Sequence, residues 1–318
     1  MPTLVRPLTA ALLLALVAIP AHAQDPAAKP AGPTVKVGGY AQVRETYRTG
    51  SRLTATLNRV RVSAEGTIPG GFSFRVMPEY EAGGSATQAA SVSLRDAYVR
   101  WTKDAFSLTA GQFKTPFSPQ FITSIAEIET ADRATAVDSL APKRDIGLMA
   151  GYTLGTWVEL QAGLFNGEGQ NRIVNVDSAN LFVGRVGVRP VPYLTLGGNV
   201  AHWSTDSTRW GADAALEWQG VTVRGEYLWQ PRSGREADKG WYAFAAYKVV
   251  PSVQLVLMQE RFVRPGVSAG QRQVATTGGA NVWLAASRIR LLANYVSREI
   301  GTPGTRRGTV VSQLQVRF

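Results

Sequence analysis

From residue 35 onward, apolar residues alternate with polar or small residues over segments separated by turn-forming residues. Between Val221 and Tyr227, for example, valine and tyrosine positions alternate with threonine, arginine and glutamate positions. A period of two residues is typical of β-strands and not of helices. The pattern predicts strands at 35–47, 53–67, 71–81, 91–102, 105–113, 144–153, 156–166, 179–189, 193–204, 208–219, 221–230, 239–250, 252–263, 272–284, 286–298 and 308–318.

An even number of antiparallel strands is expected of a single-chain bacterial barrel. The connections after even-numbered strands are short, whereas most of those after odd-numbered strands are long, and aromatic residues lie near both ends of the strands. Charged and amide residues interrupt every apolar run after residue 35, so a membrane could be crossed only by a closed barrel. We therefore expect an all-β fold, a 16-stranded antiparallel transmembrane β-barrel that spans residues 35–318 as one domain.

The N-terminus has the pattern of a secretory signal. Arg6 supplies the positive charge, residues 8–19 form the apolar centre, and residues 21–23 make a small-residue cleavage site. A membrane anchor is the weaker alternative, because the apolar run is shorter than the roughly 20 residues that a spanning helix needs. We predict a signal peptide at 1–23, cleavage after Ala23, and a flexible leader at 24–34 that is rich in proline and alanine.

Composition narrows the function. The 318 residues include no cysteine and carry a formal net charge of +11, so the excess charge must face either a partner or an aqueous interior. His202 is the single histidine after the predicted cleavage site, and a place in the aromatic girdle is the favoured explanation for it. The sequence has neither a pair of metal-spaced histidines nor a nucleophile elbow, so we expect no enzyme activity, no cofactor and no metal site.

Four short motifs make the resemblance to a known family specific: residues 94–99 (LRDAYV), 111–118 (GQFKTPFS), 143–147 (KRDIG) and 163–167 (GLFNG). Together they resemble the phosphate-selective porin family of bacterial outer membranes, and the chain also ends on Phe318, as outer-membrane barrels do. The resemblance implies a homotrimeric barrel in the outer membrane that carries phosphate or polyphosphate through a basic pore. In general porins the third loop bends into the lumen, so we interpret residues 114–143 as a constriction loop; an external loop that covers the mouth is the alternative.

Candidate residues for the anion path follow from the same alternation. An arginine facing lipid near the midplane would cost about 2 to 4 kcal/mol, so arginines on the polar faces of the strands should face the lumen. Guanidinium groups suit phosphate because they stay charged and can bond its oxygens in pairs. Those on the strands are joined by the basic residues of the 114–143 segment, and the predicted path consists of Arg44, Arg59, Arg61, Arg75, Lys114, Arg133, Lys143, Arg144, Arg185, Arg224 and Arg290.

These observations favour a passive channel for small anions, among them phosphate, polyphosphate and chloride, surrounded by outer-membrane lipid and without a nucleic-acid partner. Two other functions remain open, a general non-specific porin and a plugged structural or adhesive barrel. The acidic residues of the 114–143 segment, Glu127, Glu129, Asp132 and Asp138, argue against tight phosphate selectivity unless they pair with arginines of the wall.

Overall fold

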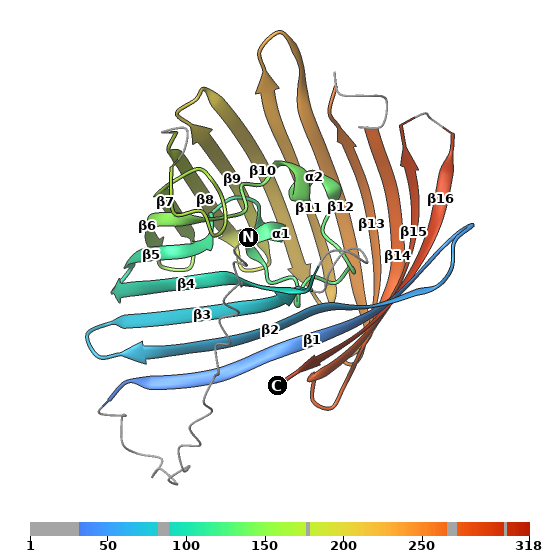
Figure 1. Ribbon diagram of the computed structural model, residues 1–318, viewed down its shortest axis with the longest axis horizontal. Coiled ribbons are helices and arrows are strands. Elements are labelled where there is room, and N and C mark those ends of the chain that lie inside the picture. Colours follow the sequence, from blue (N-terminus) through green and yellow to red (C-terminus); the bar gives the residue numbers. More distant parts are fainter. Residues whose placement is uncertain (1–31, 82–88, 176–178, 266–271, 302–303) are drawn as a thin grey trace, which may run out of the picture.

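Sixteen antiparallel strands form one closed sheet in the computed structural model, which describes residues 32–81, 89–175, 179–265, 272–301 and 304–318 (Figure 1). Each strand pairs with its neighbours in sequence, and β1 also pairs with β16. The strands are β1 (Thr34–Arg48), β2 (Thr54–Ile68), β3 (Phe72–Glu81), β4 (Ser91–Lys103), β5 (Phe106–Lys114), β6 (Arg144–Leu154), β7 (Val158–Phe165), β8 (Leu181–Val191), β9 (Leu194–Trp203), β10 (Ser207–Trp218), β11 (Val221–Arg232), β12 (Arg235–Val250), β13 (Val253–Val263), β14 (Arg272–Leu284), β15 (Ile289–Ile300) and β16 (Arg306–Arg317).

The predicted fold class is confirmed. Every predicted strand corresponds to an observed one, and the largest shift is at β12, which begins at Arg235 and not at residue 239. The predicted signal peptide and most of the predicted leader lie outside the described residues. No helix among the described residues is long and apolar enough to cross a membrane.

The last residue of the chain closes the barrel. The amide of Gly39 donates to the carbonyl of Phe318 at 3.0 Å, and the amide of Phe318 donates to the carbonyl of Gly39 at 3.1 Å. The ladder continues from Tyr40 opposite Arg317 to Arg48 opposite Thr309. In hydrocarbon an unpaired backbone group costs several kcal/mol, so this seam is as necessary as any other pair of strands.

Side chains alternate between the two faces of the wall, with a local departure on β4. There, Arg95 is an extra residue in the register with β3, so Arg95 and Asp96 do not face opposite ways: both contact polar side chains of the inner wall. A strand with one extra residue changes face at that point. On β12 the alternation is regular: Trp241 lies on the exposed outer face, whereas Tyr242 is buried and donates to Glu226 at 2.8 Å.

We predict that Gly39→Ala destabilises the closed barrel. A Cβ at residue 39 would lie 2.3 Å from the carbonyl oxygen of Arg61 and 2.7 Å from the ring of Phe318, so the seam would have to shift. Overpacking of this kind costs about 1 to 3 kcal/mol. The measurement is the temperature at which the folded barrel becomes the slower-migrating unfolded form on a gel.

Gly278→Ala is the matched control, because a Cβ there, on β14, meets no atom within 4 Å. We expect a lower transition temperature for Gly39→Ala and an unchanged one for Gly278→Ala. Equal transition temperatures for the two variants would show that the seam tolerates the added methyl group.

Candidate functional site

The connection between β5 and β6, residues 115–143, lies inside the barrel and is called the inner loop below (Figure 1). It contains two short helices, α1 (Pro119–Ile122) and α2 (Thr135–Leu140). Wall side chains of six strands hold its backbone: Glu226 on β11, Glu260 on β13, Asn281 on β14, Arg290 and Asn294 on β15, Gln315 on β16 and Arg44 on β1.

The apolar side of the inner loop packs on an apolar part of the inner wall. Phe117, Val137 and Leu140 are fully buried. They belong to one cluster with inward-facing residues of β8–β13, among them Leu181, Val183, Leu228, Phe244 and Phe262. These apolar side chains of the strands therefore face the inner loop and not lipid.

The family motifs build the two ends of the inner loop. At one end, Thr115 connects the residue after β5 to the segment before β6: its hydroxyl donates to the carbonyl of Pro142 at 2.6 Å. Next to it, the side chain of Ser118 accepts from the amide of Phe121 at 3.3 Å and caps α1. At the other end, Asp145 accepts from the amide of Gly167 at 2.9 Å. These contacts explain why such residues stand where the chain enters and leaves the lumen.

Two acidic residues of the inner loop are ion-paired with wall arginines of the predicted path. Asp132 accepts from Arg44 at 3.0 Å, and Glu129 pairs with Arg224. The carboxylates therefore tie the loop to β1 and β11. At these two positions, the wall arginines neutralise the acidic charge that argued against tight phosphate selectivity.

Opposite the inner loop, the walls of β2–β4 carry two buried carboxylates surrounded by arginines. Glu79 accepts from Arg61 at 2.7 Å, pairs with Arg95, and lies 4.0 Å from Arg59. The neighbouring carboxylate, Asp96, accepts from the arginine that begins β6, Arg144, at 2.8 Å. Cations thus outnumber the carboxylates that they surround.

Lys114 and Arg133 connect this wall to the inner loop. The ammonium of Lys114 donates to the carbonyls of Ile122 and Thr123, both at 2.8 Å. The guanidinium of Arg133 donates to the carbonyl of Thr123 at 3.0 Å. Both cations lie over the ring of Phe121, at 5.6 and 5.1 Å from its centroid.

The electrostatics place Arg133 close to the arginines of the wall. Burial is the main cause that lowers the pKa of Arg133 to about 10; the negative charge of Asp138 opposes this shift, and the positive charges of Arg59, Arg144 and Arg61 add to it. At neutral pH Arg133 remains charged. We define the basic cluster as Arg59, Arg61, Lys114, Arg133 and Arg144, four arginines and a lysine near the carboxylates of Glu79 and Asp96.

Arg75 lies at the edge of the cluster: it is partly exposed, 3.7 Å from Glu65 and 4.0 Å from Asp96. Other predicted residues lie farther from the cluster. Arg185 pairs with Asp213 through two hydrogen bonds of 2.6 and 2.9 Å. Arg290 is 3% exposed and donates to the carbonyl of Ile128, beneath the inner loop. Lys143 is exposed and lines a cavity of about 300 Å³.

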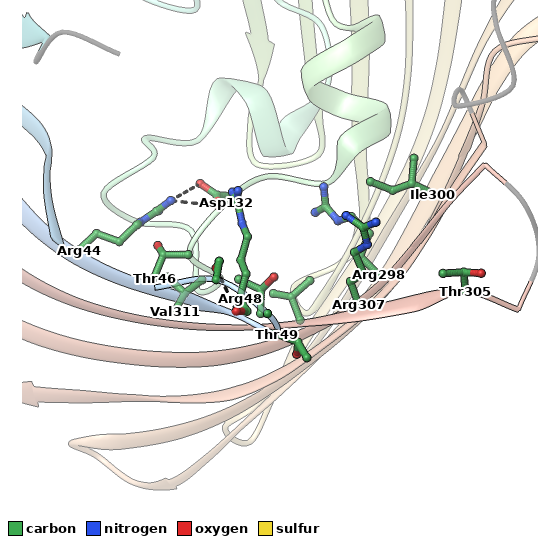
Figure 2. A pocket seen from close by; sticks show the side chains of 14 residues that line it. Arg44, Thr46, Arg48, Thr49, Asp132, Arg298, Ile300, Thr305, Arg307 and Val311 are labelled. Carbon is green, nitrogen blue, oxygen red and sulfur yellow. Dashed lines mark hydrogen bonds and ion pairs between the residues drawn. The ribbon is translucent and has the colours of Figure 1, made fainter. Parts of the chain in front are cut away.

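Two cavities flank the inner loop. The outer cavity lies toward the loop rim, the end of the barrel that carries the long connections. It has a volume of about 820 Å³ and is lined by Arg44, Arg48, Arg298 and Arg307 (Figure 2). The turn-side cavity lies toward the turn rim, the end with the short connections. It has a volume of about 310 Å³ and is lined by residues that include Arg185, Arg189 and Arg224. Arginines therefore line the lumen on both sides of the loop.

Four of these arginines were not among the predicted path residues: Arg48, Arg189, Arg298 and Arg307. Arg298 and Arg307 lie directly opposite each other on β15 and β16 and extend into the cavity next to each other (Figure 2). The alternation along each strand could have found them, since Arg298 shares its face with Arg290, and Arg48 shares its face with Arg44.

Comparison with known proteins gives the family. The family model described as "Phosphate-selective porin O and P" matches residues 37–202, which is more than half of the chain. The chain belongs to this family. As a family member it is an outer-membrane porin, a channel and not an enzyme. No curated protein sequence matches it.

Solved structures share the fold at low sequence identity. In-vitro folded OmpT of Vibrio cholerae, in its trimer form, has a TM-score of 0.67 at 11% identity and covers 90% of this porin and 100% of that chain. The anion-selective porin from Comamonas acidovorans has a TM-score of 0.66 at 12% identity, with the same coverage. The outer membrane channel DcaP of Acinetobacter baumannii has a TM-score of 0.66 at 14% identity and covers 91% and 99%.

We predict that the double variant Glu129→Gln, Asp132→Asn loosens the inner loop. Both substitutions keep the size of the side chain but remove the charge that Arg224 and Arg44 bind. Each partly buried pair contributes on the order of 1 kcal/mol, so the loop should leave its wall position more often. Single-channel recordings should show more frequent current fluctuations than the unmodified porin does.

Glu127→Gln is the control, because Glu127 is an exposed carboxylate of the same loop that has no ion pair among the described residues. Steady current in the double variant, matching that of the control, would show that the two ion pairs do not hold the loop.

Proposed function

We propose that this porin is a passive, anion-preferring channel that passes small anions such as phosphate or polyphosphate across the outer membrane. The observation that carries the proposal is the basic cluster, which lies where the inner loop occupies the lumen. Four arginines lie near two carboxylates there, so the local potential is positive where the inner loop meets the wall.

The mechanism is diffusion through several moderate sites in series. Arginines of the outer cavity raise the local concentration of anions, the basic cluster replaces part of the hydration that an anion loses, and arginines of the turn-side cavity receive it. Glu79 and Asp96 compete with the permeating anion for the same guanidinium groups. That competition weakens binding, and a permeating ion must bind weakly enough to leave.

The mature porin would begin at Gln24 and assemble as a homotrimer. The N-terminal pattern of charge, apolar centre and small residues supports the first proposal. The trimer form recorded for OmpT of Vibrio cholerae supports the second. The intact mass of the exported protein, and the mass of its detergent complex, test the two proposals separately.

A salt gradient across a planar bilayer is the direct test. We expect a reversal potential that favours chloride over potassium, because the basic cluster repels cations, and we expect added phosphate to reduce the chloride current by competing for the same arginines. A reversal potential that favours potassium would contradict the proposed anion preference but not the porin fold. A channel that carries no current would identify the plugged structural barrel.

The variant Arg59→Gln, Arg61→Gln, Arg75→Gln tests the wall of β2 and β3. With three positive charges removed, we expect the chloride-to-potassium permeability ratio to fall about threefold or more. The matched variant replaces the same three residues with lysine, which keeps the charge. If both variants behave like the unmodified porin, these arginines stabilise the wall and do not select ions.

A further inference from the structure

The outer surface of the barrel carries basic side chains at the loop rim of β12–β16. Along one row of directly opposite positions, β12–β16 place Trp241, Arg261, Val274, Glu299 and Arg306 next to one another. This row is outside the lumen, and the proposed channel function makes no use of it.

Alternation along the strands shows that the row faces outward. Glu299 is four residues from Tyr295, whose side chain is 56% exposed on the apolar outer surface. In the same way, Arg306 shares its face with the exposed Val310, and Arg261 shares its face with the exposed Leu257. The arginines therefore continue the face that meets lipid.

A second row lies next to the first and adds two more cations. Lys239 is directly opposite Val263, and Val263 is directly opposite Arg272. We define the outer basic band as Lys239, Arg261, Arg272 and Arg306. Glu299 pairs with Arg272 and lies 3.9 Å from Arg306, whereas Lys239 and Arg261 have no ion pair among the described residues. Four cations and one carboxylate leave three positive charges in excess.

The rows below the band place it at the edge of the hydrocarbon layer. Next to the band, toward the middle of the barrel, lies a polar row of Gln259, Thr276 and Ser297. In this row the hydroxyl of Thr276 donates to Gln259 at 2.6 Å. Beneath that row the outer face becomes apolar, with Leu257 and Tyr295. The sequence of apolar, polar and charged rows matches the passage from acyl chains to headgroups.

We propose that the outer basic band binds the phosphate groups of lipid headgroups in the outer leaflet. Charge complementarity selects this occupant: arginine binds phosphate with paired hydrogen bonds, and basic residues at a bilayer surface attract anionic lipid. A second copy of the chain that docked on this face would place its own positive band against the first, and the two bands would repel each other unless the copy were rotated so that they did not meet. Lys239 and Arg261 are the members of the band with free charges to offer.

The test uses the purified full-length porin in neutral detergent, with lipid A that carries two phosphates as the probe and the same lipid without phosphate as the reference. The variant Arg261→Gln, Arg306→Gln removes two cations of the outer face. Its matched control is Arg298→Gln, Arg307→Gln, in which Arg307 follows Arg306 directly but lines the lumen. Binding is measured by native mass spectrometry, with folding of each variant checked by gel migration.

We expect the outer variant to bind phosphorylated lipid A about thirtyfold more weakly, and the inner control to bind it as the unmodified porin does. Binding to the unmodified porin should also weaken as salt is raised, a result that does not depend on any variant folding. Equal affinity for the two lipids, or equal loss in the inner control, would overturn the proposal. A dissociated assembly in the outer variant, with lipid affinity unchanged, would instead assign this face to a second copy.

The same variants separate this proposal from the channel proposal. Chloride preference in a planar bilayer should be unchanged in the outer variant, because its side chains do not face the lumen. A porin that binds phosphorylated lipid but prefers cations would contradict the channel proposal alone.

Discussion

The need to pair every backbone amide and carbonyl in a medium without water is the constraint on which the whole structure depends. It is met only when the sheet has no edge, and the contact between Gly39 and Phe318 removes the last one. Once the cylinder is closed, the two faces of each strand meet two different solvents. Apolar side chains can then cover the outside. Charged side chains, which are costly to place in lipid, are hydrated or form ion pairs inside.

A lumen of this width admits a second structural layer, and the inner loop supplies it. Its buried aromatic and aliphatic residues give part of the inner wall a hydrophobic core, which is unusual for a surface expected to be wet. Two of its carboxylates, Asp132 and Glu129, are paired with arginines of β1 and β11. The position of the loop and the proposed anion preference therefore depend on the same few ion pairs.

The number of strands and their bounds could be predicted from the sequence, because side chains of each strand alternate between lipid and the lumen, and this produces a hydrophobic period of two residues. The bend of the inner loop into the lumen came from family resemblance and not from the pattern of its residues. The pairing of Glu129 with Arg224 joins residues 95 positions apart, and local pattern contains no information on such contacts. The burial of Leu181 and Val183 under the inner loop is a similar case, because an apolar side chain has the same pattern in the sequence whether lipid or a loop covers it. Arg95 lay beyond prediction because one inserted residue changes the face of the strand.

The attachment of the inner loop to opposite parts of the wall has a mechanical consequence. A thin cylinder of sixteen strands resists stretching along its hydrogen bonds but can be flattened easily, since flattening breaks none of them. Contacts from the loop to β1, β11, β13, β14, β15 and β16 work as an internal brace against that deformation. The roundness of the cylinder and the position of the inner loop therefore cannot vary independently, and lateral pressure from the surrounding membrane would be transmitted to the loop.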